Sequence, residues 1–146
     1  MSSDALRSVI EDVTHTWQQE GVPLLAPTDS AAVRTELSKT GQQISDDVVD
    51  LYCTTGGMAK NEMDSHCFSM WPFDQVVALN KKRSYLAFAD FLIDSHFYGF
   101  VYESKARSKV CMDYGKYGTE LEIITDSVEE FFQKYLVDPR ALCLLS

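Results

Sequence analysis

Two copies of the tripeptide Asp-Ser-His, at residues 64–66 and 94–96, place the three residue types of a serine-hydrolase triad side by side. In a triad, histidine takes the proton of the serine hydroxyl while the carboxylate orients the imidazole. Adjacent residues on a strand or turn point in different directions, so we do not expect Ser65 and His66 to meet as nucleophile and base. The chain also lacks the G-x-S-x-G turn. The sequence therefore predicts no hydrolase chemistry at these residues.

Metal binding is a second chemistry to weigh at the same place. Asp64, His66 and Cys67 are close together in the chain, and Cys111 or His96 could complete a tetrahedral zinc site. Their spacing matches no standard zinc motif, and no two cysteines form a C-x-x-C pair. We therefore expect no metal, no cofactor and no catalytic residue in this chain.

The four cysteines are Cys53, Cys67, Cys111 and Cys143. A reactive thiol needs an electropositive setting that lowers its pKa. Cys53 lies near the C-terminus of an expected helix, with Asp50 one turn before it, and this setting opposes thiolate formation. Without an apparent secretory signal, we expect the cysteines to be reduced and to serve as small buried hydrophobes.

The pair Gly56–Gly57, in the segment LYCTTGGM, could belong to a phosphate-binding loop or could end a helix. A phosphate loop needs its glycines before a helix, so that the amides of the helix N-terminus face the anion. These glycines follow an apolar, helix-like run, and the chain has neither of the two common glycine-rich phosphate motifs. The position predicts a left-handed glycine in a Schellman-type cap.

Three helices are expected in the first half of the chain. The first covers 4–19 and carries apolar residues with helical spacing up to Trp17. A second begins at Asp29 or Ser30. Ser45 is expected to cap the third, in the segment ISDDVVDLYCTT, whose two leading aspartates suit the helix dipole.

The second half changes to a period of two, which is typical of strands. FSMW, YLAFADFL, FYGFVYES, KVCMDY and TELEIIT are the strand candidates, and GKYG is the expected hairpin loop. Pro72 can open a short helix, and Ser127 with Glu130 forms a capping box before the last one. The prediction is one α+β domain over 1–146, with an antiparallel-rich sheet of about 4–6 strands flanked by N-terminal helices and a C-terminal helix.

The composition excludes some classes of function. The 146 residues carry 22 Asp plus Glu against 13 Lys plus Arg, for a net charge of -9, so direct binding of nucleic acid is not expected. A basic protein partner would be attracted instead. No apolar run reaches the roughly 20 residues of a membrane helix, and we expect a cytoplasmic protein.

The order of several short segments resembles the SUKH superfamily, which includes a fungal cell-wall-synthesis regulator and many bacterial immunity proteins. They are Trp17, GVPLLAP, Gly56–Gly57, MWPFDQV with Trp71 and Pro72, FAD beginning at Phe88, and SVEEFFQKYL with Phe131. The likeness covers about 17–138, and its shared positions are structural. It implies a non-catalytic immunity protein, or antitoxin, that neutralises a polymorphic toxin such as a nuclease by covering the basic face of the toxin.

Acidic and aromatic side chains are the candidate contacts for such a partner, because aromatics anchor interfaces and carboxylates steer them. Two alternatives remain open: a regulatory adaptor for a housekeeping partner, and a small enzyme or ligand-binding protein with a pocket between sheet and helices. The chain is expected to be a monomer or a homodimer. The candidate contacts are Asp46, Asp47 and Asp50 on the exposed side of the third helix, with Tyr114, Tyr117, Glu120 and Glu122 in the second half.

Overall fold

The computed structural model describes residues 2–80, 84–91, 96–113 and 121–142. The helices are α1 (Ser2–Gln19), α2 (Ser30–Ser38), α3 (Asp46–Thr54), α4 (Phe73–Leu79) and α5 (Val128–Val137), followed by the 3-10 turn η1 (Pro139–Leu142). The strands are β1 (Phe68–Met70), β2 (Leu86–Phe91), β3 (His96–Tyr102), β4 (Ser108–Asp113) and β5 (Glu122–Thr125). The expected GKYG loop, with Gly115 and Gly118, lies outside the described residues.

The strands form one five-stranded antiparallel sheet in chain order, β1-β2-β3-β4-β5. The α+β fold in a single domain is therefore confirmed, with a strand number inside the expected range. The register shifts in β2 between Ala87 and Ala89, and in β4 between Val110 and Cys111 where β5 pairs with it. Such irregularities bend and twist a sheet locally.

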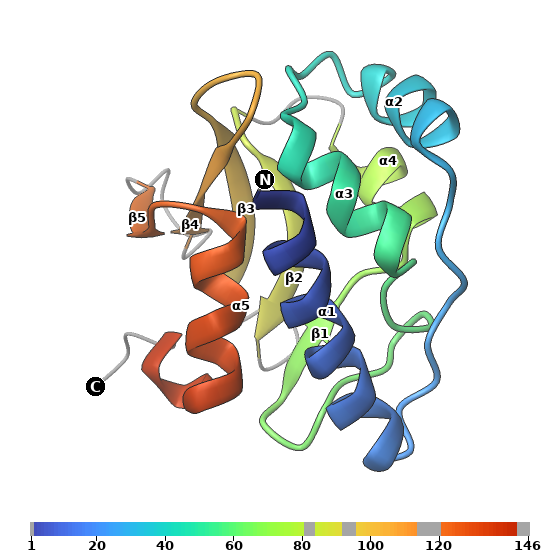
Figure 1. Cartoon of the computed structure of the whole chain (residues 1–146), viewed down its shortest axis with the longest axis vertical. Helices are drawn as coiled ribbons and strands as arrows, with labels where there is room; N and C mark the ends of the chain where they lie inside the picture. The colour runs from blue at the N-terminus through green and yellow to red at the C-terminus, as the bar shows by residue number, and fades with distance from the viewer. Residues whose placement is uncertain (1, 81–83, 92–95, 114–120, 143–146) are drawn as a thin grey trace.

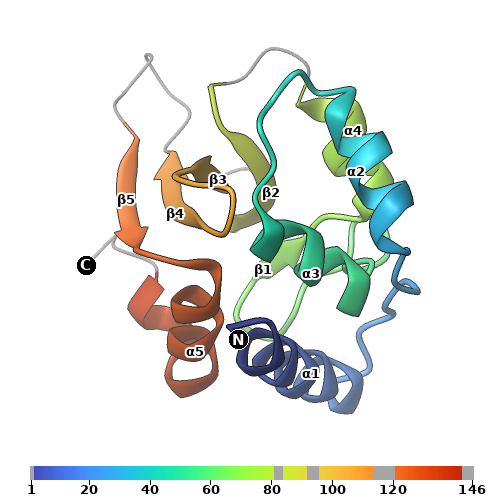
Figure 2. The ribbon, with the colours of Figure 1, turned by 45° about the horizontal axis from the view of Figure 1, so that its top comes forward.

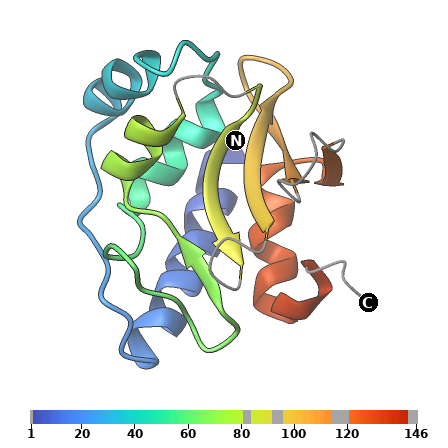
Figure 3. The ribbon, with the colours of Figure 1, turned by 180° about the vertical axis from the view of Figure 1, so that it is seen from behind.

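Helices α1, α3 and α5 build a layer against one face of the sheet. α1, α3 and α5 lie in front of the strands in Figure 1, and β2 and β3 lie in front of α1 and α5 when the molecule is seen from behind in Figure 3. Figure 2 shows α5 beside α1 at one end of the molecule and α2 beside α4 at the other. In the part of the chain described, no helix is long and apolar enough to cross a membrane.

Aromatic rings fill the space between the helices and the sheet. Trp17, on α1, stacks on Phe68 with ring centroids 6.1 Å apart. Phe131, on α5, meets the edge of Phe88 on β2 at 5.7 Å, and all four side chains are buried. Offset and edge-to-face pairs of this kind add stability beyond the area they bury. The structural roles predicted for Trp17, Phe88 and Phe131 are thus consistent with their positions.

Gly56 and Gly57 follow α3, but the prediction of a Schellman cap is wrong. Helix α3 ends at Thr54, and Thr55 already has extended dihedrals of -148° and 145°. Gly57 has a φ of +90°, whereas Gly56 has no positive φ. The helix therefore ends by turning directly into an extended segment, without the left-handed residue that a Schellman cap places after the last turn.

Close contact between backbones explains the glycine pair. A Cβ added at Gly56 would lie 2.4 Å from the carbonyl oxygen of Ala26, and one added at Gly57 would lie 2.3 Å from that of Trp71. The Gly56 amide donates to the Leu25 carbonyl, and the Gly57 amide donates to Thr55 Oγ1. These amides are therefore bonded within the protein, which agrees with the expectation that the pair does not cradle a phosphate.

Trp71 and Pro72 connect β1 to α4. Trp71 is buried, and its indole N–H donates to Asp90 at 2.8 Å. Pro72 is the N-cap of α4 rather than its first helical residue, one position from the prediction, and its carbonyl accepts the amides of Gln75 and Val76. The proline therefore sets the direction in which the chain enters α4.

The two predicted serine caps differ. Ser127 Oγ accepts the Glu130 amide at 3.0 Å, so the cap of α5 is confirmed, while the Glu130 carboxylate accepts the Asp126 amide instead of the Ser127 amide. Ser45 stands at the N-cap of α3 but makes no capping bond, and this prediction is wrong. Its hydroxyl turns toward a neighbouring carboxylate, that of Asp47, which belongs to the site described next.

Candidate functional site: the acidic surface

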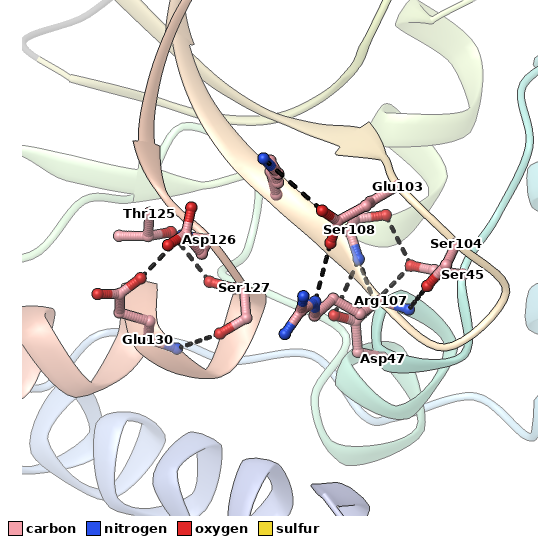
Figure 4. A network of polar contacts seen from close by, with 11 residues as sticks. Ser45, Asp47, Glu103, Ser104, Arg107, Ser108, Thr125, Asp126, Ser127 and Glu130 are labelled. Atoms are coloured by element: carbon pink, nitrogen blue, oxygen red, sulfur yellow. Dashed lines mark hydrogen bonds and ion pairs between the residues drawn. The ribbon is translucent and has the colours of Figure 1, made fainter.

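Asp47 is the centre of a buried polar network that joins α3 to β4 (Figure 4). Its carboxylate accepts the Ser108 amide at 3.1 and 3.2 Å and the Ser45 hydroxyl. The Val128 backbone, at the start of α5, also lowers the pKa of this carboxyl group. Ser45 Oγ lies 2.7 Å from Ser108 Oγ and closes the network. One carboxylate thus connects two elements that are distant in sequence.

The placement of Asp47 on the exposed side of α3 is therefore wrong. The residue is only 8% exposed. Burial raises the pKa of its carboxyl group, and hydrogen bonds from Ser45 and from backbone amides oppose that rise. A signal was present in the sequence, because Asp47 precedes the buried Leu51 by one helical turn and shares its face.

Asp46 and Asp50 remain at the surface of α3, as expected. Asp46 forms an ion pair with Arg34 of α2 at 2.8 Å, and both side chains are about half exposed. The pKa of Asp50 is raised, mainly by partial burial and also by Asp46, while the nearby Arg7 and Arg34 lower it. Positive side chains therefore offset much of the negative charge on this side of the molecule.

The second group of predicted contacts can be placed only in part. Tyr114, Tyr117 and Glu120 lie outside the described residues. Glu122 begins β5, where it is exposed beside Ile123, which is 44% exposed. Among the described residues, Glu122 is thus the member of that group that could meet a partner.

A further set of carboxylates, which the sequence reading did not single out, lies on the helical layer. The residues that α1 buries, from Leu6 to Trp17, recur with helical spacing. The opposite side of the same helix consequently presents Asp4, Glu11 and Asp12 to solvent. The signal was available in the sequence, since these acidic residues alternate with the apolar stripe.

Helix α5 lies beside α1 and adds two acidic residues in its first turn (Figure 2). The cations on these two helices with described side chains are Arg7 and Lys134, and Lys134 is 3.6 Å from Glu130. Glu129 and Glu130 are half-buried, and Glu129 lines a hollow with Leu6 and Arg107, so the exposed carboxylates of this helix pair lie on α1. We call the solvent side of α1 the acidic helical face; it comprises Asp4, Glu11 and Asp12.

Two hollows with charged side chains in their walls adjoin these residues and could be sites for a ligand. One, of about 400 Å3, lies beside Asp47 and includes Arg107, and the other, of about 550 Å3, includes Arg7 and Asp50. In the first hollow, Arg107 pairs with Glu103 at 2.9 Å, and the Asp47 carboxylate is occupied by amide donors. The ionisable groups of this hollow are thus engaged within the protein.

The amides at the helix N-termini beside the first hollow are engaged as well. Asp46 and Asp47 donate theirs to the carbonyls of Lys105 and Ala106, at 2.7 and 3.3 Å. An anion at the start of α3 would have to displace those contacts. The β3–β4 connection consequently acts as the cap that Ser45 does not provide.

Ser65 and His66 do come together, contrary to our expectation, and Ser65 also contacts Glu20. Ser65 Oγ lies 3.3 Å from His66 Nδ1 and also donates to the Glu20 carboxylate at 3.0 Å. Asp64 accepts the backbone amides of His66 and Phe68, at 2.8 and 3.0 Å, so it is occupied in holding the turn. A triad needs the carboxylate to orient the imidazole ring, and these contacts serve the backbone instead.

The second Asp-Ser-His copy is described only at His96, which is fully buried in β3. His96 Nε2 lies 3.3 Å from the Tyr98 hydroxyl. Burial lowers the pKa of the imidazole, because the charged form loses its hydration. Its structural setting is therefore that of a neutral core residue.

Among the described residues, no cluster of three His, Cys, Asp or Glu side chains could hold a metal ion. Burial, together with the nearby Asp50, raises the pKa of the Cys53 thiol. Burial also raises the pKa of the Cys111 thiol to about 12, while Cys67 is half-buried. Cys53 and Cys67 are thus less buried than expected, and Cys143 lies outside the described residues.

No protein-family model matches this sequence, and no curated protein matches it.

Proposed function

We propose that this protein is a non-catalytic binding protein of the SUKH type that neutralises a basic protein partner. The partner would be a toxin domain such as a nuclease, whose active surface must attract phosphates and is therefore positively charged. Carboxylates that approach such a surface speed the encounter and occupy the place of nucleic acid charge. On this proposal the protein acts in the cytoplasm and binds its partner stoichiometrically.

The acidic helical face is the observation that carries the proposal. Glu11 and Asp12 lie opposite the buried stripe of α1, so the core does not depend on their charge. Asp46, Asp50 and Glu122 remain additional candidate contacts on other elements, whereas Asp47 is buried. The proposal thus separates carboxylates that can be changed without harm to the fold from the one that cannot.

Two matched double variants test the proposal. Glu11→Gln with Asp12→Asn changes the acidic helical face, and Glu62→Gln with Asp74→Asn changes the net charge equally elsewhere on the surface. Purified basic toxin domains encoded by neighbouring genes would be titrated by calorimetry and assayed for inhibition of their activity. The first variant is expected to weaken binding about tenfold at low salt, and the second less than about twofold.

Two results would count against this function. One is equal weakening by both double variants, which would show that net charge alone governs binding. The other is the absence of micromolar binding to every candidate toxin domain, together with unchanged toxin activity. A turnover by the purified protein that depends on His66 or Ser65 would instead favour an enzyme.

A further inference from the structure

A cavity of about 300 Å3 lies between the turn before β1, strands β2 and β3, helix α5 and η1. Phe68, Tyr98, Tyr135 and Leu142 are buried, while Phe91 is half-buried at the end of β2. The rings of Phe68 and Tyr135 are 5.1 Å apart and tilted by 53°, so they form a corner rather than a flat wall. The cavity therefore offers aromatic ring faces in several orientations.

The hydroxyl groups around the cavity already have partners in the protein. Tyr135 Oη accepts the Trp17 indole N–H at 2.8 Å, and the Tyr98 hydroxyl donates to the Leu142 carbonyl at 3.3 Å. Trp17 also donates to Asp64 at 3.2 Å. An occupant consequently gains more from its apolar surface than from hydrogen bonds to these groups.

The solvent side of the cavity is polar and is held in place by the chain. Ser65 and His66 are exposed, and Cys67 is half-buried. Ser65 donates its amide and its hydroxyl to the Glu20 carboxylate, at 2.8 and 3.0 Å. A carboxylate beside the opening disfavours an anionic occupant by like-charge repulsion.

We propose that this cavity binds a small uncharged bicyclic aromatic molecule, for which indole is the probe. Its volume is twice that of the roughly 150 Å3 apolar cavity that accommodates one benzene ring, so two fused rings fit. Offset and tilted aromatic contacts suit the corner formed by Phe68 and Tyr135. The site lies apart from the acidic helical face, and the proposal does not depend on the proposed function.

The two tryptophans make the test internally controlled. Trp17 Nε1–H donates to Tyr135 on the cavity wall, whereas Trp71 Nε1–H donates to Asp90 and Trp71 does not line the cavity. In an NMR titration of the ¹⁵N-labelled full chain with indole, the Trp17 side-chain peak is expected to move saturably and the Trp71 peak to stay. The expected dissociation constant is roughly 0.1–1 mM, as befits a ligand of about nine non-hydrogen atoms.

Two variants locate the binding. Leu142→Trp fills the cavity and is expected to weaken indole binding at least about tenfold, whereas Leu79→Trp, on an exposed part of α4, is expected to change it less than about twofold. If Leu142→Trp loses the dispersed amide spectrum of a folded protein, Phe91→Trp tests the same point from another wall. Equal affinity in the cavity variant and in Leu79→Trp overturns the proposal.

The wild-type titrations are decisive without any variant. No saturable movement of the Trp17 peak up to about 5 mM indole overturns the proposal, because binding that weak is not distinguishable from nonspecific contact. Indole-2-carboxylate is expected to bind at least about fivefold more weakly than indole, because of the Glu20 charge beside the opening. Tighter binding of that anion overturns the assignment of an uncharged ligand.

Discussion

Asp47→Ala is expected to lower the free energy of unfolding by about 2–4 kcal/mol. The substitution leaves the Ser108 amide and the Ser45 hydroxyl without their acceptor, and both residues are buried. An unsatisfied buried donor costs about 1–3 kcal/mol, which gives about 2–6 kcal/mol for two. The pKa of Asp47 is raised by burial, so relief of that desolvation offsets part of the loss and favours the lower half of the range.

Asp46→Ala is the matched control, since it removes a neighbouring carboxylate from the same helical turn. Asp46 is half-exposed and pairs with Arg34, so its loss is expected to cost less than about 1 kcal/mol. Urea denaturation at pH 7, followed by circular dichroism, measures both variants. For a chain of this size the loss in Asp47→Ala corresponds to a decrease of roughly 5–15 °C in Tm.

Equal stabilities of Asp47→Ala and Asp46→Ala would refute the reasoning. If Asp47→Ala kept its stability but lost affinity for a basic partner, Asp47 would be a partner contact and the network would carry little energy. If it lost stability and the folded fraction kept its affinity, the structural role would be confirmed.

Four other changes test separate features. Gly57→Ala is expected to lower the free energy of unfolding by more than about 3 kcal/mol, since the added Cβ meets the Trp71 carbonyl. Gly41→Ala is expected to lower it by about 1 kcal/mol, because Gly41 has a φ of +77° but open space around it. Thermal unfolding compares the two variants. Tyr52→Phe is expected to be neutral or to stabilise by about 1 kcal/mol in urea titrations, because among described atoms its buried hydroxyl has no partner. Ser127→Ala removes the N-cap of α5 and is expected to lower the free energy of unfolding by about 1 kcal/mol, measured in the same urea titrations. The raised pKa of Asp64 means that the folded state holds this proton more tightly than the unfolded chain. The stability that the raised pKa of Asp64 contributes is therefore present below about pH 4 and is lost as the pH rises through the pKa of the folded state. Asp64→Asn is expected to flatten that part of the dependence of the unfolding free energy on pH.

Periodicity was sufficient for the elements themselves. The apolar spacing up to Trp17 predicted α1, and the alternation in FYGFVYES predicted β3, because each pattern reflects which face of an element is buried. Local hydrogen-bonding chemistry was sufficient for the cap at Ser127, since its partner is three residues away.

The candidate site was less predictable, because its decisive contacts join distant segments. Asp47 is covered by Ser108, which is 61 residues further along the chain. The local sequence does not reveal this contact, and the polarity of the Asp47 side chain suggested exposure. Gly57 is required by the Trp71 carbonyl, and no pattern near the glycine pair specifies that approach. Residue type predicts these positions only once the three-dimensional neighbours are known.

The bond between Trp17 and Tyr135 spans 118 residues and has a consequence for synthesis on the ribosome. Each strand pairs with its neighbour in the sequence, so hairpins can assemble as the chain emerges. The Trp17 indole is translated 118 residues before Tyr135, so its N–H must wait for α5 before it can reach this acceptor. Its fluorescence on a nascent chain would therefore report the moment at which translation has released enough sequence to complete the fold.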